Sequence, residues 1–172
     1  MSSPAADQGS QLLALYDRAL PQVYGYLSAR AGDRTTAEDL TAETFLAAVQ
    51  AIERRAVPNL TIAWLVTVAR NKLVDHWRRM EREERGLRLA SDPGADVVDD
   101  DLDARFDRAR AHDVLAQLGA HHRAALTLRY LDGLPVPEVA EHLGRSVHAT
   151  EALLVRARNA FRVRYGEGSC DA

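Results

Sequence analysis

The chain has 172 residues, of which 47% are hydrophobic and 27% are charged, and its formal net charge is −3. This length allows one medium domain or two small ones. Because the net charge is negative, the overall field does not attract phosphates, and any contact with nucleic acid must come from local basic patches. A single cysteine, Cys170, argues against a disulfide framework or a cysteine metal site and fits a reducing compartment.

The N-terminal sequence MSSPAADQGSQ lacks the basic and apolar regions of a secretory signal peptide. No apolar stretch approaches the roughly 18–20 residues that a membrane span needs. We therefore expect a cytoplasmic protein without membrane insertion.

Helix-forming residues dominate the chain, and isoleucine occurs only at positions 52 and 62. This composition predicts an all-α fold. A first helix is expected from about Gln11 to Ala31, with a kink or break at Pro21. Thr35 and Glu38 have the spacing of a capping box, which predicts the start of a second helix.

The second helix has two different faces. The face predicted to lie in the core follows the spacing i, i+3, i+4, i+7 and comprises Phe45, Ala48, Val49 and Ile52. The other face comprises Asp39, Ala42, Glu43 and Leu46. Acids around an outward leucine suit contact with another protein, but a merely solvated face is the commoner arrangement.

A third helix is predicted after the loop ERRAVPNLT, with Thr61 as its cap and its end near Arg82. Its inward stripe is expected to comprise Ile62, Val66, Ala69, Leu73, Trp77 and Met80. The opposite side comprises Trp64, Val68, Asn71, Asp75 and Arg78. The N-terminal half of this helix is thus apolar on both sides, which indicates a central position.

The same helix is basic toward its C-terminal end. Its cations are Arg70, Lys72, Arg78, Arg79, Arg82, Arg85 and Arg88. Cations beside tryptophans suit single-stranded or partly melted DNA, which needs neutralised phosphates and a surface for unstacked bases. The alternative is a solvated helix end with Trp77 in the core. Glu81, Glu83 and Glu84 also reduce the net positive charge of this patch.

Residues 91–108, SDPGADVVDDDLDARFDR, hold seven aspartates. Such a segment has too little apolar surface to order itself, so we expect a flexible acidic linker. A second helical lobe begins near Ala111, with a break near Gly119 and a helix that ends at Gly133. A further helix starts around Pro137, where the missing N–H costs nothing. Ser146 is expected to cap the last helix, whose predicted inward stripe is Val147, Thr150, Leu154, Ala157 and Phe161.

The last two helices have the pattern of a helix-turn-helix. Ala140 allows close helix packing, and Gly144 allows the tight turn. The second helix would then offer its first turns to the major groove. Its candidate DNA-contacting residues are Arg145, Ser146, His148, Ala149, Glu151, Ala152 and Arg156. Many helical pairs share this pattern without binding DNA, so the motif alone leaves the question open.

An enzyme is not supported by the motifs. The chain has no Glu-x-x-His, no His-Glu-x-x-His, no phosphate loop and no Gly-x-Ser-x-Gly. His121 and His122 are adjacent, so on a helix they are expected to point away from a common ligand. We expect no catalytic residue, no metal and no cofactor.

Three segments in this order resemble the extracytoplasmic-function (ECF) sigma factors, bacterial initiation factors of the sigma-70 family. AEDLTAETFLAAV (37–49) is similar to the family's polymerase-binding helix, with Ala42 in place of the usual glutamine. WLVTVARNKLVDHWRR (64–79) is similar to the minus-ten helix, and LGAHHRAALTLRYLDGLPVPEVAEHLG (118–144) to the start of sigma region 4. The resemblance covers about residues 10–80 and 111–164.

The resemblance implies sigma region 2 at residues 10–88, an acidic linker at 89–110 and sigma region 4 at 111–166. Asp39, Ala42, Glu43 and Leu46 would bind the β′ clamp helices of core RNA polymerase. The minus-ten element would be contacted by the 53–60 loop and by Trp64, Arg70, Asn71, Asp75, Arg78 and Arg79. The resemblance also implies the β flap of the polymerase and promoter DNA as partners, with an anti-sigma factor as a candidate partner. The linker acids Asp99, Asp100 and Asp101 would mimic RNA phosphates in the polymerase channel.

The last helix departs from the family pattern. Glu151, Ala152 and Leu153 stand where lysine, serine and arginine are common, which puts the usual minus-thirty-five contacts in doubt. A weak DNA-binding domain suffices when polymerase supplies a second attachment. Glu151 could accept a hydrogen bond from a cytosine amino group, or could face Arg145 or solvent. Two alternatives stay open: a stand-alone helix-turn-helix regulator and a carboxylate-bundle metalloprotein.

Overall fold

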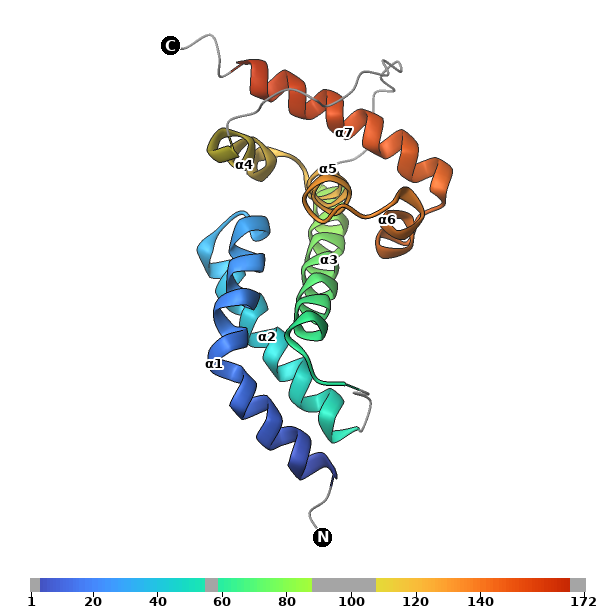
Figure 1. The fold of residues 1–172 in the computed structure, drawn as a ribbon. Coiled ribbons are helices and arrows are strands. Elements are labelled where there is room, and N and C mark those ends of the chain that lie inside the picture. Colours follow the sequence, from blue (N-terminus) through green and yellow to red (C-terminus); the bar gives the residue numbers. More distant parts are fainter. Residues whose placement is uncertain (1–3, 55–58, 88–107, 168–172) are drawn as a thin grey trace. The chain divides into compact units, whose positions relative to one another are not determined.

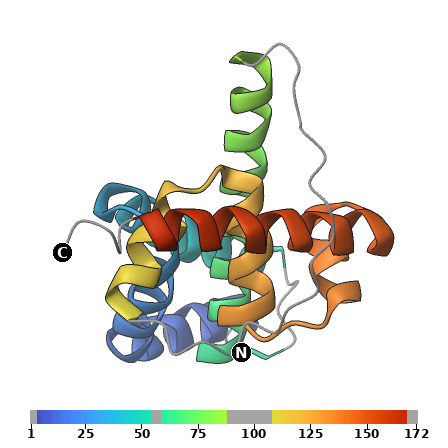
Figure 2. The ribbon, with the colours of Figure 1, turned by 90° about the horizontal axis from the view of Figure 1, so that it is seen from above.

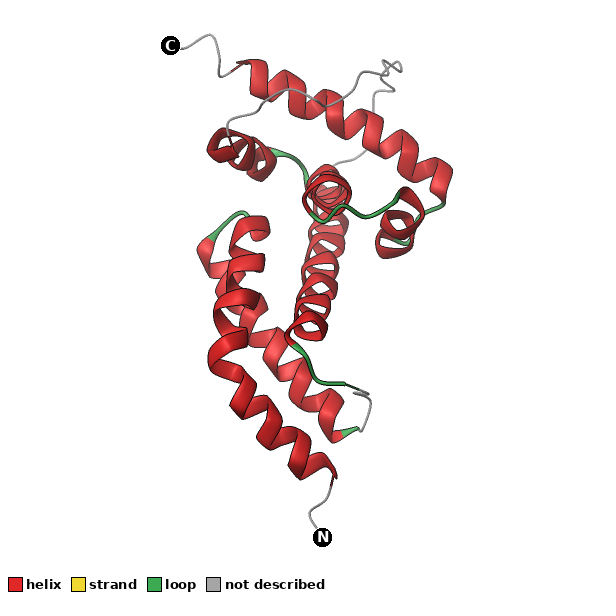
Figure 3. Ribbon diagram, viewed as in Figure 1, coloured by secondary structure: helices red, strands yellow, loops and turns green. Residues whose placement is uncertain are grey.

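The computed structural model describes residues 4–54, 59–87 and 108–167. Throughout these ranges the regular structure is helical, without a strand, as Figure 3 shows. The all-α prediction is therefore confirmed. The chain divides into two compact units, Met1–Leu73 and Val74–Ala172, and the division falls inside the third helix.

The first two helices are α1 (Pro4–Ala31) and α2 (Arg34–Glu53), which pack against each other (Figure 1). α1 begins earlier than expected and runs through Pro21 without interruption, so of the predicted kink or break the break is wrong. Ala19 and Val23, on either side of the proline, are both fully buried. Packing on both sides of Pro21 outweighs the one backbone hydrogen bond that proline removes.

α2 is capped by Asp33 and not by Thr35. The Asp33 carboxylate accepts a hydrogen bond from the Thr36 backbone N–H at 2.8 Å and another from the Thr36 hydroxyl at 2.7 Å. Glu38, the expected partner of Thr35, pairs instead with Arg34 at 2.7 Å. The hydrogen bond and charge of Glu38 raise the pKa of Arg34 above its ordinary value. Aspartate ranks above threonine as a cap, which explains why the cap lies two residues earlier than expected.

The buried face of α2 is rotated from the predicted one. Ala48 and Ile52 are buried as expected, but Phe45 is half-buried and Val49 is 42% exposed. The buried residues of α2 are Ala37, Leu40, Thr41, Thr44, Ala48 and Ile52. The two buried threonines each donate their hydroxyl to the carbonyl four residues earlier at 2.7 Å, which satisfies these groups inside the core.

α3 spans Ile62–Leu87. The Thr61 hydroxyl accepts a hydrogen bond from the Trp64 N–H at 3.1 Å, so the predicted cap is confirmed. The buried residues of α3 are Leu65, Ala69, Leu73, Val74 and Trp77. The predicted stripe is right in its centre but wrong at its end, because Met80 is 37% exposed. The interpretation of Trp77 as a core residue is confirmed.

The remaining helices are α4 (Arg108–Gln117), α5 (Ala120–Leu126), α6 (Val136–Leu143) and α7 (Val147–Glu167). α5 passes directly into a π-helical turn at Thr127–Leu131, which the sequence analysis missed. α7 lies across α4, α5 and α6, as Figure 2 shows. The expected break near Gly119 and the Ser146 cap are confirmed, and α6 starts at Val136, so that Pro137 lies in its first turn as expected.

Two apolar clusters hold α7 in place. One comprises Val114, Leu118, Leu126, Ala157 and Phe161, and the other comprises Ala125, Leu153 and Leu154. The predicted inward stripe is wrong at Val147, which is 43% exposed, and it omitted Leu153, which is 1% exposed. Burial of Leu153 turns α7 so that Val147 faces outward.

At the C-terminal end of α7, the Arg110 guanidinium donates to the Tyr165 carbonyl and lies 4.3 Å from the centre of the Tyr165 ring.

Candidate nucleic-acid interface

The acidic face of α2 is open to solvent. Asp39, Ala42 and Glu43 are exposed, and Leu46 is 58% exposed. Glu43 lies 3.8 Å from the Lys72 ammonium of α3, and both side chains stay substantially accessible. The arrangement surrounds an apolar side chain with carboxylates, which suits a partner surface that is basic with an apolar centre.

A groove between α1 and α2 borders this face and was missed by the sequence analysis. Its volume is about 550 Å³, and its lining residues are Tyr16, Leu20, Pro21, Tyr24, Arg34, Glu38, Thr41, Ala42 and Phe45. The rings of Tyr16 and Phe45 are 4.9 Å apart at its edge. Its walls come from two helices, and spacing within one helix does not reveal which side chains of another helix converge with it.

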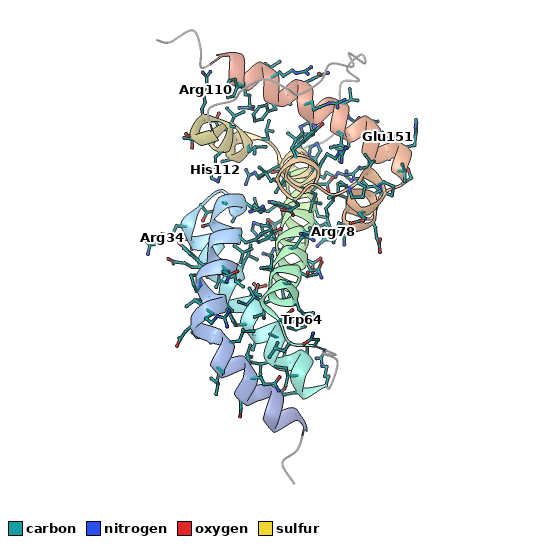
Figure 4. The ribbon with its side chains drawn as sticks, in the orientation of Figure 1. Arg34, Trp64, Arg78, Arg110, His112 and Glu151 are labelled. Atoms are coloured by element: carbon teal, nitrogen blue, oxygen red, sulfur yellow. The ribbon has the colours of Figure 1, made fainter. Side chains whose placement is uncertain are left out.

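The candidate minus-ten residues lie along one helix, α3. Asn71, Asp75 and Arg79 are exposed, whereas Trp64, Arg70 and Arg78 are half-buried. Figure 4 shows Trp64 at the N-terminal end of α3 and Arg78 more than three turns further along. An accessible indole followed by cations provides both a stacking surface and phosphate partners, as binding of unpaired DNA requires.

The helix-turn-helix is formed by α6 and α7. Ala140 is buried, and Gly144 has φ +63°, a left-handed conformation that closes the turn at low cost because glycine has no Cβ. The Arg145 N–H donates to the Ala140 carbonyl at 3.0 Å, and the Ser146 hydroxyl accepts from the Ala149 N–H at 3.1 Å. The predicted roles of these glycine and serine residues are confirmed.

The candidate minus-thirty-five residues differ in accessibility. Those that are exposed are Ser146, His148, Glu151 and Ala152, and those that are half-buried are Arg145, Ala149 and Arg156. Figure 4 shows Glu151 projecting away from α7. Arg145 is paired with Glu81 of α3 at 2.5 Å, so the expected alternative of a pairing with Glu151 is wrong. Of the two alternatives to a DNA contact of Glu151, only a position facing solvent is left.

The histidine pair differs from the expectation. The rings of His121 and His122 lie 4.1 Å apart and do not point away from each other.

Among the residues that the structure describes, no group of three or more histidines, cysteines or acids could hold a metal ion. The described helices also include none that is both long and apolar enough to cross a membrane. The linker residues Asp99, Asp100 and Asp101 lie outside the described residues.

Comparisons with known proteins agree with the arrangement of motifs. The family model "Sigma-70 region 2" matches residues 15–83, and "Sigma-70, region 4" matches residues 108–161. The chain is similar in fold to the sigma factor RpoE of Bartonella quintana, in a structure with the anti-sigma factor NepR. The TM-score is 0.51 at 22% identity, over 91% of this chain and 94% of that one.

Two curated relatives are similar along most of the chain. The ECF RNA polymerase sigma factor SigL of Mycobacterium tuberculosis is 33% identical over 97% of this chain and 96% of its own length. The ECF RNA polymerase sigma factor BldN of Streptomyces coelicolor is 35% identical over 83% of this chain. The match covers only 56% of the length of BldN. The chain therefore belongs to the ECF sigma factors of the sigma-70 family, the alternative sigma factors that bind core RNA polymerase and direct transcription initiation at specific promoters.

Proposed function

We propose that the acidic face of α2, formed by Asp39, Ala42, Glu43 and Leu46, is the surface that binds the β′ clamp helices of core polymerase. The observation that supports this assignment is that Leu46, at 58% exposure, shares one face of α2 with the exposed carboxylates of Asp39 and Glu43. The two carboxylates beside it would select a basic partner surface and guide its approach. Polymerase binding is thereby assigned to a surface separate from both DNA-binding helices.

The promoter is contacted by two separate elements in this proposal. Along α3, Trp64, Arg70, Asn71, Asp75, Arg78 and Arg79 bind the minus-ten element together with the 53–60 loop. At the start of α7, Arg145, Ser146, His148, Ala149, Glu151, Ala152 and Arg156 bind the minus-thirty-five element. The half-buried Trp64 and the cations of α3 support the first assignment, and the helix-turn-helix geometry supports the second.

The whole chain has three parts in this proposal. Region 2 spans residues 10–88, the acidic linker 89–110 and region 4 111–166, and region 4 contacts the β flap. The structure adds one detail, since α4 is already helical at Arg108. The chain acts in the cytoplasm as a specificity factor without catalysis of its own, and an anti-sigma factor is a candidate regulator.

A pull-down with purified core polymerase tests this function directly. The chain is expected to be retained by core polymerase in the absence of DNA, because polymerase binding and promoter binding use different surfaces. A chain that binds promoter DNA but is not retained by polymerase would be a stand-alone regulator, and the proposal would be wrong.

The linker is expected to act through its charge. Replacing Asp99, Asp100 and Asp101 with serine should leave polymerase binding intact but change the ratio of abortive to full-length transcripts. A tether tolerates a change of composition, whereas a mimic of RNA phosphates does not. The measurement is the length distribution of transcripts made in vitro by the two holoenzymes. If the two distributions coincide, the segment serves only as a connection.

Glu151 is expected to contribute to selection of the upstream element. Its carboxylate would repel phosphates unless it accepts a specific hydrogen bond, such as one from a cytosine amino group. Glu151→Ala should then relax the preference at one position by roughly 1–3 kcal/mol. Glu151→Lys should raise affinity for many sequences and steepen the salt dependence, since it adds a phosphate partner.

The measurement for Glu151 is transcription from a promoter library in which the upstream element is randomised. Wild-type and Glu151→Ala holoenzymes are compared for the sequences that they select. Equal selection at every upstream position would show that Glu151 makes no specific base contact.

A further inference from the structure

One side of α7 faces away from the apolar clusters that hold the helix. His148, Glu151, Ala152 and Val155 have the spacing i, i+3, i+4, i+7, which places them together on this side. The first three are exposed, Val155 is half-buried, and Glu151 projects away from the helix (Figure 4). These four residues are called the reading face. The buried residues of α7 lie on the opposite side and are Thr150, Leu153, Leu154, Ala157 and Phe161.

The reading face starts directly after the turn of the helix-turn-helix. Ser146 caps α7, so Val147 is its first helical residue. From Val147 to Val155 the helix rises about 12 Å. The major groove of B-DNA is about 12 Å wide, and a helix-turn-helix inserts the N-terminal end of its second helix there. Val155 is therefore the last residue of this face that reaches the bases.

The chemistry of the reading face is unusual for a DNA-binding helix. It offers one carboxylate, one imidazole and two apolar side chains, and none of its four residues is a lysine or an arginine. Guanine is read mainly by an arginine or a lysine that donates to its O6 and N7 atoms. Arg145 and Arg156 are half-buried and flank the face, a position that suits the phosphates at the borders of the groove. Readout of guanine by the centre of this face is therefore not favoured.

Thymine is the base that apolar side chains recognise. Its C5 methyl group lies in the major groove, where alanine and similar side chains contact it. Ala152 and Val155 are almost one turn apart, so their positions along α7 differ by about 4.5 Å. Successive base pairs are about 3.4 Å apart. The two apolar side chains are thus spaced to contact methyl groups of two neighbouring base pairs.

We propose that α7 recognises the minus-thirty-five element through the methyl groups of two neighbouring thymines, one in contact with Ala152 and the other with Val155. Val155 lies outside the set of residues assigned to this element above. The inference rests on the proposed function, since it requires that α7 enters the major groove of that element. It adds the chemical feature that the helix selects, which is a pair of methyl groups and not the acceptor atoms of guanine.

Replacing thymine with uracil tests these contacts, because the change removes the methyl group and keeps the base pair. The probe is a fluorescent promoter duplex that the wild-type holoenzyme selects from a library with a randomised upstream element. Each thymine of that element is replaced singly, and the dissociation constant of the holoenzyme is measured. Uracil at two neighbouring positions is expected to weaken binding about fourfold each, the equivalent of one buried methyl group.

Two results of this experiment would overturn the proposal. One is a selected element without neighbouring thymines. The other is an element with thymines at which uracil changes nothing, since the preference for these base pairs would then come from the shape of the DNA and not from the methyl groups.

A matched pair of variants assigns one methyl contact to Val155. Val155→Ala and Val163→Ala each remove two methyl groups from α7, but Val163, which is 59% exposed, lies more than two turns beyond Val155 and outside the groove. The measured quantity is the ratio of the affinities of one holoenzyme for the thymine and the uracil promoter. A partial loss of folding lowers both affinities equally and cancels in this ratio.

Val155→Ala is expected to lower the ratio from about four to about one at one of the two positions, because the methyl group loses its partner. Val163→Ala should keep the wild-type ratio at both positions. A Val155→Ala holoenzyme with both wild-type ratios would show that Val155 contacts neither methyl group, and the proposal would be wrong.

Ala152→Gly tests the second contact, since it removes the Cβ atom from the reading face. The ratio is expected to fall to about one at the other position and to stay near four at the position assigned to Val155. If uracil still weakens binding at both positions, Ala152 is not a contact and the proposal fails. Failure of the proposed function would look different, because the wild-type holoenzyme would then select no upstream sequence from the library.

Discussion

Leu153→Arg is expected to unfold the helix-turn-helix unit or to destabilise it by more than about 4 kcal/mol, a range reached only by exceptional substitutions. Leu153 is 1% exposed and packs with Ala125 and Leu154, and Val136 and Leu143 border this cluster. The arginine would bury a charge with no carboxylate in the cluster, and its longer side chain would overpack it. ECF sigma factors often have arginine at this position, so the expected failure is specific to the packing of this chain.

Ala152→Arg is the matched control, because it adds the same side chain one residue earlier on the exposed side of α7. Its unfolding free energy should stay within about 0.5 kcal/mol of the wild type, as is usual for surface substitutions. The measurement is urea unfolding of the full chain, followed by circular dichroism of the helices. If Leu153→Arg unfolds at the same urea concentration as Ala152→Arg, the burial of Leu153 is wrong.

Asp39→Arg combined with Glu43→Arg is expected to weaken binding to core polymerase by about 100-fold, because like charges at an interface cost several kcal/mol. Both carboxylates are exposed and point away from the buried face of α2. Removing them should therefore change the unfolding free energy by less than about 1 kcal/mol. The measurement is the dissociation constant for core polymerase, obtained by titration with a labelled chain.

A second double variant separates the surface from the change in net charge. Asp17→Arg with Glu53→Arg makes the same charge change at exposed positions outside the acidic face of α2. Its affinity for polymerase should stay near that of the wild type. Equal weakening by both double variants would mean that overall charge, and not this face, governs the binding.

Local signals explain which parts of the fold the sequence predicts. Thr61 and Ser146 cap their helices, and Gly144 adopts a left-handed conformation, because each of these features depends only on a few neighbouring residues. The failures concern which side of a helix is buried. Val49 and Val147 are exposed although they fit an apolar spacing, because packing against other helices decides the rotation of each helix about its axis.

The sequence predicts which residues of the candidate site share one face of a helix, but not which residues of different helices meet. Motifs place Asp39, Glu43 and Leu46 on one exposed face, since residues on one helix keep their spacing whatever packs around them. The pairing of Glu81 with Arg145 joins residues 64 positions apart, and no spacing rule reaches across such a separation. The groove between α1 and α2 was missed for the same reason, because its walls come from two helices.

Promoter-specific initiation is tested most directly by transcription in vitro with purified core polymerase from a library of randomised promoters, with and without this chain. We expect core polymerase with the wild-type chain to initiate at a restricted set of sequences with preferred minus-ten and minus-thirty-five elements. The Asp39→Arg, Glu43→Arg chain should give no more transcript than core polymerase alone. Initiation that does not depend on the wild-type chain, or that shows no sequence preference with it, would contradict the account.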